Sequence, residues 1–202
     1  MVASRKISPR HSSGSEEWGT PLPFFEELDL EFGGFYLDAA ASSTNYKVNR
    51  YFTKEQDALS QSWGMTPKEK AERSSAPGAK RGAVWLNPPY SRGVLSEFFK
   101  KAHEESEKHG ITVVMLVPPR TSTKYWHRYA MKAHEIRAIF GRVSFVRSDG
   151  YQNAAPADSV LVIFRGGEVS EAGYVLFNPI ILGPIMTQGY YPPESRRERR
   201  KT

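Results

Sequence analysis

The sequence predicts an α/β fold in which helices flank a doubly wound, mostly parallel β-sheet. One observation is the run "ITVVMLVPP" from Ile111, which is continuously apolar and rich in β-branched residues, as in central strands covered on both faces. A second is the preceding stretch "VLSEFFKKAHEESEKHG", whose apolar residues follow helical spacing until Gly110 ends the helix. Strands that alternate with helices in this way are typical of parallel sheets.

The other elements follow the same alternation. "TPLPFFEELDLEF" predicts a short helix, with Thr20 as a possible cap and a proline at the next position. The apolar run 35–37 follows a glycine break and predicts a buried strand that ends on Asp38, before a tight loop. A second helix is expected in "TKYWHRYAMKA", and further strands in "HEIRAIF", "RVSFV" and "SVLVIF".

The chain of 202 residues is long enough for one domain with a substantial core and with tails at both ends. Residues 1–17 have almost nothing to bury and predict a disordered basic leader, so the domain is expected over residues 18–165. Residues 64–82 are polar and basic, with Pro and Gly, and predict a loop or a disordered insert. Residues 166–202 are expected to form a C-terminal extension with the basic tail "SRRERRKT".

Composition excludes several classes of function. The chain has no cysteine, which excludes disulfide scaffolds, thiolate metal sites and cysteine nucleophiles. No apolar run is long enough to span a bilayer and the N-terminus lacks a signal-peptide centre, so we expect a soluble intracellular protein with no membrane partner. The histidines lack neighbours at ligand spacing, and no metal site is predicted. A net charge of +6 favours a polyanionic partner or, alternatively, a basic surface that keeps the protein soluble.

The segment "VWLNPPY" places a stiff polar loop directly after an apolar strand. Pro88 and Pro89 remove two backbone donors and fix two φ angles, so the loop can be neither a helix interior nor a central strand. In an open α/β sheet, ligands bind beyond the carboxyl ends of the strands, where Asn87 is expected. The Asn87 amide and the Pro88 carbonyl would offer an amino group two neutral acceptors, which localise its nitrogen lone pair for attack on an electrophilic carbon.

Tyr90 indicates what would carry that amine. Its side chain can stack on the ring that bears the amine, most naturally a nucleobase, and a paired base would have to be flipped out of the duplex to be reached. The alternative is that "NPPY" is an ordinary turn, because Asn and Pro are common turn residues. The position of the tetrapeptide after the strand-like run "AVWL" favours the functional interpretation.

"NPPY" after an apolar strand resembles the catalytic motif of amino-group methyltransferases that use S-adenosylmethionine. The chain also has, in order, "WGTP", "YLDAAAS", "RYFTKEQDALSQSW", "VVMLVPPRTSTKYWH", "GRVSF" and "SVLVIF". From Trp18 to Phe164 these segments resemble the phage and prophage DNA N6-adenine methyltransferases of the Dam-like type. The resemblance implies a Rossmann-like methyltransferase fold over residues 18–165, S-adenosylmethionine as cofactor and double-stranded DNA as partner, in the cytoplasm of a bacterial host. GATC-like target sites are a further expectation from the family.

The resemblance implies roles for the residues of the stiff loop and for three arginines. Asn87 and Pro88 would accept the adenine amine, Pro89 would fix the loop, and Tyr90 would stack on the flipped base. Arginines near the loop and at strand ends would contact DNA phosphates. Alternatively, these arginines are ordinary surface charges. The expected DNA-binding residues are Arg92, Arg120 and Arg142, and the insert 64–82 is either a DNA-binding loop or a solvated insertion.

Cofactor contacts are implied at three places. Thr20 in "WGTP" would contact the methionine part, and Asp38 would be the acidic residue of the cofactor loop, unless it caps a helix. Asp57 lies at the position that binds the cofactor adenine amine, with a solvated charge as the alternative, and Glu55 is an alternative for a ribose contact. The expected cofactor-binding residues are Thr20, Pro21, Asp38, Ala39, Ala40 and Asp57.

Three other functions are compatible with the same loop. An N4-cytosine DNA methyltransferase shares base flipping and amine methylation, although Asn rather than Ser at position 87 resembles the adenine enzymes. A protein-glutamine methyltransferase poses the same chemical problem but usually has an auxiliary N-terminal domain. A non-enzymatic DNA-binding protein would explain the basic tails and would leave "NPPY" as a turn. The reaction we predict is methyl transfer to the N6 amine of adenine in DNA.

Overall fold

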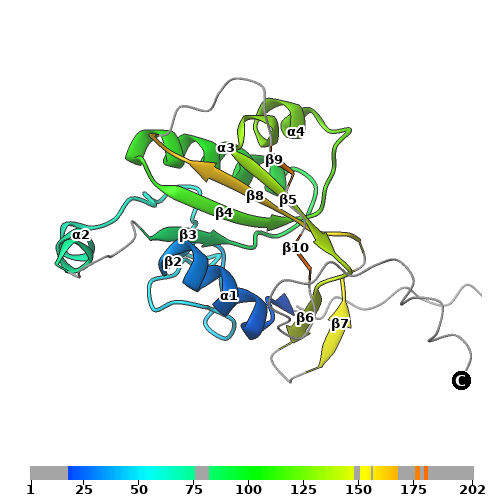
Figure 1. The fold of residues 1–202 in the computed structure, drawn as a ribbon, viewed down its shortest axis with the longest axis horizontal. Coiled ribbons are helices and arrows are strands. Elements are labelled where there is room, and N and C mark those ends of the chain that lie inside the picture. The colour runs from blue at the N-terminus through cyan, green and yellow to red at the C-terminus, as the bar shows by residue number, and fades with distance from the viewer. Residues whose placement is uncertain are drawn as a thin grey trace, which may run out of the picture.

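A mixed β-sheet forms the centre of the molecule in a computed structural model, which describes residues 18–75, 82–147, 151–155, 157–167, 176–177 and 180–181. Its main strands are β2 (Phe35–Asp38), β3 (Ala83–Leu86), β4 (Thr112–Val117), β5 (Glu135–Phe140) and β8 (Val160–Arg165). Two short strands, β9 (Leu176–Phe177) and β10 (Ile180–Ile181), pair with β5. The order across the sheet is β10-β5-β8-β4-β3-β2 (Figure 1).

The strand directions confirm the mostly parallel sheet and correct it at one strand. β2, β3 and β4 pair in parallel, whereas β8 is antiparallel to both β4 and β5. The connection between β5 and β8 explains why β8 is antiparallel. After β5, the chain forms a hairpin of β6 (Ser144–Arg147) and β7 (Gln152–Ala154), which forms a separate sheet with β1 (Trp18–Gly19). The chain therefore re-enters the central sheet from the edge at which β5 ended, and the returning strand runs the opposite way.

Helices cover both faces of this sheet, as an α/β fold requires. Helix α1 (Leu22–Phe32) packs Phe24, Phe25, Leu28 and Phe32 onto one face, together with residues such as Trp85. Helix α3 (Val94–His109) packs Leu95, Phe98, Phe99 and Ala102 onto the other, with α4 (Lys124–Arg128) beside it (Figure 1). Alternate strand residues serve the two clusters, as in Val84 and Trp85 of β3. The predicted helix before β4 is confirmed, including its end at Gly110.

Three local predictions were wrong in detail. Thr20 does not cap α1, because the N-cap is Pro21 and no side chain caps this end. The insert 64–82 is not a plain loop, since α2 (Pro67–Ser74) begins at a capping box in which Thr66 and Glu69 bond each other's backbone amides. The second helix is α4 followed by the 3₁₀ turn η1 (Ala130–Lys132), not one continuous helix.

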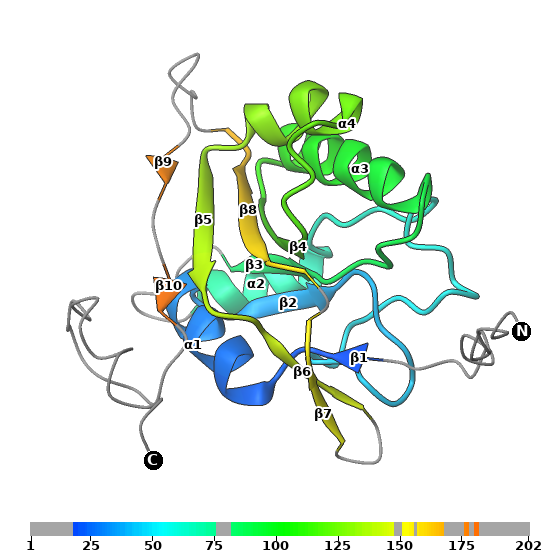
Figure 2. The same ribbon diagram turned by 90° about the vertical axis from the view of Figure 1, so that its right-hand side faces the viewer.

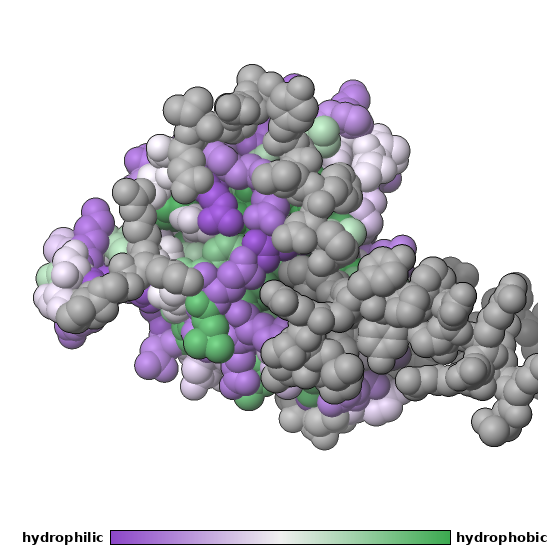
Figure 3. Space-filling view, in the orientation of Figure 1, coloured by the Kyte–Doolittle hydropathy of each residue, from purple (hydrophilic) through white to green (hydrophobic). Residues whose placement is uncertain are grey.

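The predicted leader 1–17 lies outside the described residues, as do residues 76–81 of the insert and most of the C-terminal extension. Among the helices that the structure describes, none is long and apolar enough to cross a membrane. Where residues are coloured in Figure 3, hydrophilic side chains lie beside smaller hydrophobic patches.

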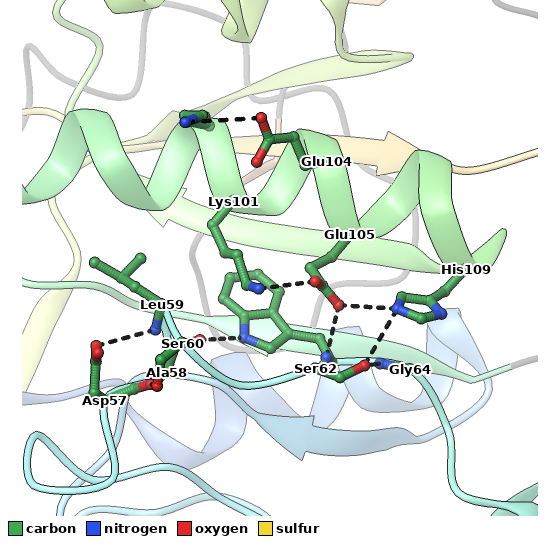
Figure 4. Close-up of polar contacts among 12 residues, drawn as sticks. Asp57, Ala58, Leu59, Ser60, Ser62, Gly64, Lys101, Glu104, Glu105 and His109 are labelled. Atoms are coloured by element: carbon green, nitrogen blue, oxygen red, sulfur yellow. Dashed lines mark hydrogen bonds and ion pairs between the residues drawn. The ribbon is translucent and has the colours of Figure 1, made fainter.

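The segment between β2 and α2 is fixed on α3 by a buried carboxylate (Figure 4). Glu105 accepts a hydrogen bond of 2.7 Å from the backbone amide of Trp63 and one of 2.8 Å from Lys101 Nζ, and it lies 3.3 Å from His109 Nε2. The Trp63 ring is fully buried and donates to the Ala58 carbonyl. The turn at Asp57 is thereby attached to the long helix, since it directly precedes Ala58.

Candidate active site

The carboxyl ends of β2 and β3 bring two of the predicted loops together. Asp38 is in register with Trp85, and the Ala39 amide donates a 2.9 Å hydrogen bond to the Trp85 carbonyl. Because the strands are parallel, the loop that starts at Ala39 and the loop that starts at Asn87 leave the sheet at the same edge. Figure 2 shows β2 and β3 side by side, with α4 above them and β1, β6 and β7 below.

Asn87 lies in a chain of side-chain hydrogen bonds. Its Nδ2 donates to Thr20 Oγ1 over 3.3 Å, and its Oδ1 accepts from the Tyr90 hydroxyl over 2.8 Å. Thr20 is buried, and its hydroxyl faces Asn87 instead of the start of α1. The structure therefore brings the predicted residue Thr20 into one group with Asn87 and Tyr90, although Thr20 is 67 positions from Asn87 in the sequence.

Tyr90 is held in place from two further sides. Its hydroxyl also lies 3.1 Å from the Leu116 carbonyl of β4, and its backbone carbonyl accepts a 3.0 Å hydrogen bond from the Arg120 guanidinium. Burial raises the pKa of the Tyr90 phenol, which keeps it a neutral hydrogen-bond donor. In this arrangement the hydroxyl occupies the Asn87 oxygen that is predicted to accept the amine. An amide oxygen has two lone pairs, so Asn87 Oδ1 can accept a second hydrogen bond beside that of the hydroxyl.

Asp38 is a buried carboxylate that shapes the loop after β2. One of its oxygens accepts from the Lys47 amide over 3.1 Å, and the other lies 3.4 Å from the Ala40 amide. Burial raises the pKa of Asp38 to about 6, against the lowering effect of these amides and of the Lys47 charge. The alternative that Asp38 caps a helix is wrong, because the chain continues as a loop and returns beside β2 at Tyr51.

Lys47 is a residue of this site that the sequence did not reveal. Its side chain is half-buried, and its Nζ would lie 3.7 Å from a Cβ placed on Gly19, next to Thr20. Burial lowers the pKa of Lys47, and the nearby Asp38 opposes that shift. Within the described part of the chain, Nζ forms no hydrogen bond. The polar run "STNYKVNR" contains no local pattern that distinguishes this lysine, because only the fold places it beside Gly19.

The remaining cofactor candidates, Asp57 and Glu55, lie on the exposed part of the segment that follows the loop. Asp57 has a φ of 49°, in the left-handed region, and its carboxylate accepts from the Leu59 amide over 3.3 Å. This bond makes Asp57 a turn residue in the structure. No hydrogen bond between described residues links Asp57 or Glu55 to Asn87 or Thr20.

The three predicted DNA-binding arginines are exposed at the same end of the sheet. Arg92 lies in the turn after the "NPPY" loop, Arg120 follows β4, and Arg142 lies between β5 and β6. None of them forms an ion pair with a carboxylate in the described ranges. Pro88 is buried, whereas Pro89 is exposed. No group of three or more His, Cys, Asp or Glu side chains among the described residues is arranged to hold a metal ion.

Comparison with known proteins supports the resemblance read from the motifs. The family model for DNA N-6-adenine-methyltransferase (Dam) matches residues 8–175. The chain belongs to the Dam family. It is 29% identical over 198 residues to a DNA N-6-adenine-methyltransferase of Escherichia phage T1, covering 85% of this chain and 76% of that protein. It is 30% identical over 139 residues to the enzyme of the same name from Haemophilus phage HP1, covering 68% and 70%.

Membership of the Dam family confirms the predicted class of enzyme, a DNA N6-adenine methyltransferase. It also decides between the alternatives that the loop alone left open. The family is named for methylation of adenine N6 in DNA, and not for methylation of cytosine or of protein glutamine, nor for DNA binding without catalysis. The roles of individual residues remain predictions, and the geometry above shows which of them can act together.

Replacement of Asp38 by asparagine should change how stability depends on pH. A carboxyl with a raised pKa binds its proton more tightly in the folded state, so its contribution is complete below the unfolded pKa and is lost as pH rises through about 6. The amide of the variant cannot titrate. We therefore expect the wild type to lose roughly 1 kcal/mol of unfolding free energy relative to Asp38→Asn between about pH 5 and about pH 7.5. Urea unfolding at both pH values measures the difference.

Glu97→Gln on α3 is the control for removal of one acidic group, because Glu97 is exposed. A difference between wild type and Asp38→Asn that stays constant across this pH range would show that Asp38 does not titrate within it.

Proposed function

We propose that the protein transfers a methyl group from S-adenosylmethionine to the N6 amine of an adenine flipped out of double-stranded DNA, on a Rossmann-like methyltransferase fold. The observation that carries the proposal is the Asn87 amide, held between Thr20 and Tyr90 beside the Asp38 loop in a Dam-family chain. A short GATC-like sequence is the proposed target, on the family resemblance.

The residues around Asp38 fit this cofactor chemically. The amino-acid end of S-adenosylmethionine carries a carboxylate and an ammonium group, and the Lys47 ammonium and the Asp38 carboxylate are suitable partners for them. Ala40 has a small, partly exposed side chain that permits close approach to the chain, whereas Ala39 is fully buried. Asp57 would contact the adenine amine from the segment that Glu105 fixes on α3. When bound, the cofactor supplies an electrophilic methyl group on a sulfonium.

The Asn87 loop supplies the means to activate the amine. Asn87 Oδ1 and the Pro88 carbonyl would accept the two amine protons, which directs the nitrogen lone pair toward the methyl carbon. As the N–C bond forms, the C–S bond breaks, nitrogen gains positive charge, and one amine proton then leaves to solvent. Asn87 stays neutral throughout. Thr20 fixes which way its amide points, because its hydroxyl accepts from Nδ2, and Oδ1, which accepts from Tyr90, keeps its second lone pair for the base.

Asn87→Ala should greatly slow methyl transfer while leaving cofactor binding intact. The variant removes one of the two acceptors for the amine and leaves the Asp38 loop unchanged. By analogy with the loss of one preorganised hydrogen-bonding group in an active site, we expect kcat to fall about 10²–10³-fold. The measurement is transfer of labelled methyl to unmethylated duplex DNA, with the digested nucleosides identified by mass spectrometry.

The product identifies the reaction in the same experiment. N6-methyladenine in the wild type supports the proposal, and N4-methylcytosine would contradict the choice of base. Full activity of Asn87→Ala would contradict the assigned loop. Calorimetry with S-adenosylhomocysteine confirms that the variant still binds a cofactor analogue.

Tyr90→Phe and Tyr90→Ala separate the ring from the hydroxyl. If the ring stacks on the base, Tyr90→Phe should retain transfer within about threefold, whereas Tyr90→Ala should lose roughly 10–100-fold in kcat/KM, since stacking contributes about 1–3 kcal/mol per base. Steady-state kinetics on a duplex substrate measure both. Equal losses in the two variants would show that the hydroxyl on Asn87 matters and the ring does not.

Lys47→Met tests the cofactor assignment without catalysis. Loss of a charged hydrogen bond should weaken binding of S-adenosylhomocysteine, which has the carboxylate, by about tenfold or more. Binding of 5′-methylthioadenosine, which lacks the amino-acid end, should not change. Isothermal calorimetry with both ligands gives the comparison, and an equal loss for both would mean that Lys47 shapes the loop and does not bind the carboxylate.

A further inference from the structure

A shallow hollow on α4 and η1 carries a concentration of positive charge. It has a volume of about 520 Å³ and is lined by Ser122, Lys124, His127, Arg128 and Lys132, all of which are exposed. Three of the five side chains are permanent cations at neutral pH, one is an imidazole, one is a hydroxyl, and no carboxylate contributes to the lining. We refer to these five residues as the α4 hollow.

The helix itself explains why these side chains point the same way. Lys124, His127 and Arg128 are separated by three and four positions, which places them on one face of a helix. Trp126 is buried on the opposite face and packs with Phe99 of α3. Burial of this tryptophan therefore turns the basic face of α4 toward solvent.

None of the cations of the α4 hollow forms an ion pair with a carboxylate of the described residues. On neighbouring α3, by contrast, Lys101 pairs with Glu105 at 2.8 Å and Lys100 approaches Glu104 at 4.0 Å. Clustered like charges repel each other, so an unpaired group of this kind favours a polyanionic ligand. A serine hydroxyl beside the cations adds a hydrogen-bond donor of the sort that contacts phosphate.

The α4 hollow is connected to the candidate active site through the chain that precedes it. Arg120 donates to the Tyr90 carbonyl, and α4 begins four residues later at Lys124. Arg92 and Arg120 are also exposed, Arg92 two residues after Tyr90 and Arg120 bonded to the Tyr90 carbonyl. A base flipped onto Asn87 stays attached to its strand, so phosphates flanking it must pass over the surface near this loop.

We propose that the α4 hollow binds phosphates of the DNA strand that flanks the flipped adenine, a role that rests on the proposed function. Lys124, Arg128 and Lys132 neutralise the phosphates, and Ser122 and His127 add hydrogen bonds. Contacts of this kind are independent of base sequence and hold the duplex in place while the base leaves the stack. The hollow thus contributes affinity and position, and Asn87 with Tyr90 provides the contact to the base.

The test is the salt dependence of DNA binding by the full chain. Fluorescence anisotropy with a duplex of about 20 base pairs containing GATC, from about 50 to about 200 mM NaCl, compares wild type with the double variant Lys124→Ala/Arg128→Ala. Loss of two phosphate contacts should lower the slope of log K against log salt by about 1.8. The wild-type affinity should then fall about tenfold more than that of the variant over this range.

A matched control removes the same charge elsewhere. Lys68→Ala/Lys70→Ala lies on α2 of the insert 64–82, which Figure 1 shows at the far end of the molecule from α4, and it also tests the alternative that this insert binds DNA. Both lysines are exposed, and this variant should keep the wild-type slope. Lys124→Arg/Arg128→Lys preserves the charge of the α4 hollow and should also keep it. Circular dichroism verifies that every variant is folded.

An unchanged slope in Lys124→Ala/Arg128→Ala would overturn the proposal, as would an equal decrease in the charge-preserving variant Lys124→Arg/Arg128→Lys. A decrease seen with RNA of the same length but not with DNA would assign the hollow to another polyanion and overturn it too. The methyl-transfer assay on wild type keeps the two proposals distinguishable: transfer with an unchanged slope refutes the hollow alone. A lowered slope without any transfer supports phosphate binding by the hollow and refutes the proposed reaction.

Discussion

The parallel register of β2 against β3 is the constraint on which the candidate site depends. The Ala39 amide bonds the Trp85 carbonyl, so the Asp38 loop and the Asn87 loop start at neighbouring points on one edge. An irregularity in β2 between Phe35 and Leu37 shifts the pairing, since Phe35 is opposite Ala83 and Leu37 is opposite Val84. A strand residue changes face with every shift of one. This irregularity therefore determines which face of the sheet the side chain of Asp38 lies on.

The two side chains that are hydrogen-bonded to Asn87, those of Thr20 and Tyr90, are uncharged, and this is consistent with the chemistry proposed for Asn87. A neutral amide between the hydroxyls of Thr20 and Tyr90 can be partly buried at modest cost, whereas a carboxylate in the same place would lose solvation or take up a proton. Asp38 illustrates the second case, because burial raises its pKa. The adjacent prolines add rigidity without adding charge. The loop can thus present acceptors in a fixed direction while remaining close to apolar strands.

The elements that the sequence predicted well are those whose signal is local. The apolar run of β4 and the spacing of α3 each specify an element through neighbouring residues. The direction of β8 was missed because it depends on where the β6–β7 hairpin leaves the chain, which no residue of "SVLVIF" encodes. The capping box at Thr66 was a local signal that the polar composition of the insert concealed.

For the candidate site, too, local motifs could be read from the sequence, whereas contacts between distant residues could not. "NPPY" predicted Asn87 as a site residue because two prolines after a buried strand are informative by themselves, and "WGTP" predicted Thr20 through resemblance. The bond between Thr20 and Asn87 spans 67 positions, and Lys47 reaches Gly19 only through the fold of the loop. Contacts of such range depend on the packed structure. Sequence therefore indicated the residue types of the reaction, while the structure indicated which of them are hydrogen-bonded to one another.

Net charge becomes informative once it is placed on the fold. The excess of +6 in the chain is compatible with either a solvated surface or a polyanionic partner. In the described residues, several basic side chains already have acidic partners, as Arg137 does with Glu31 and Glu135. Those of the α4 hollow do not, and they follow directly on the segment bonded to Tyr90. Pairing elsewhere thus leaves unpaired cations close in the chain to the loop that we propose receives the base, where electrostatic attraction can orient a polyanionic substrate.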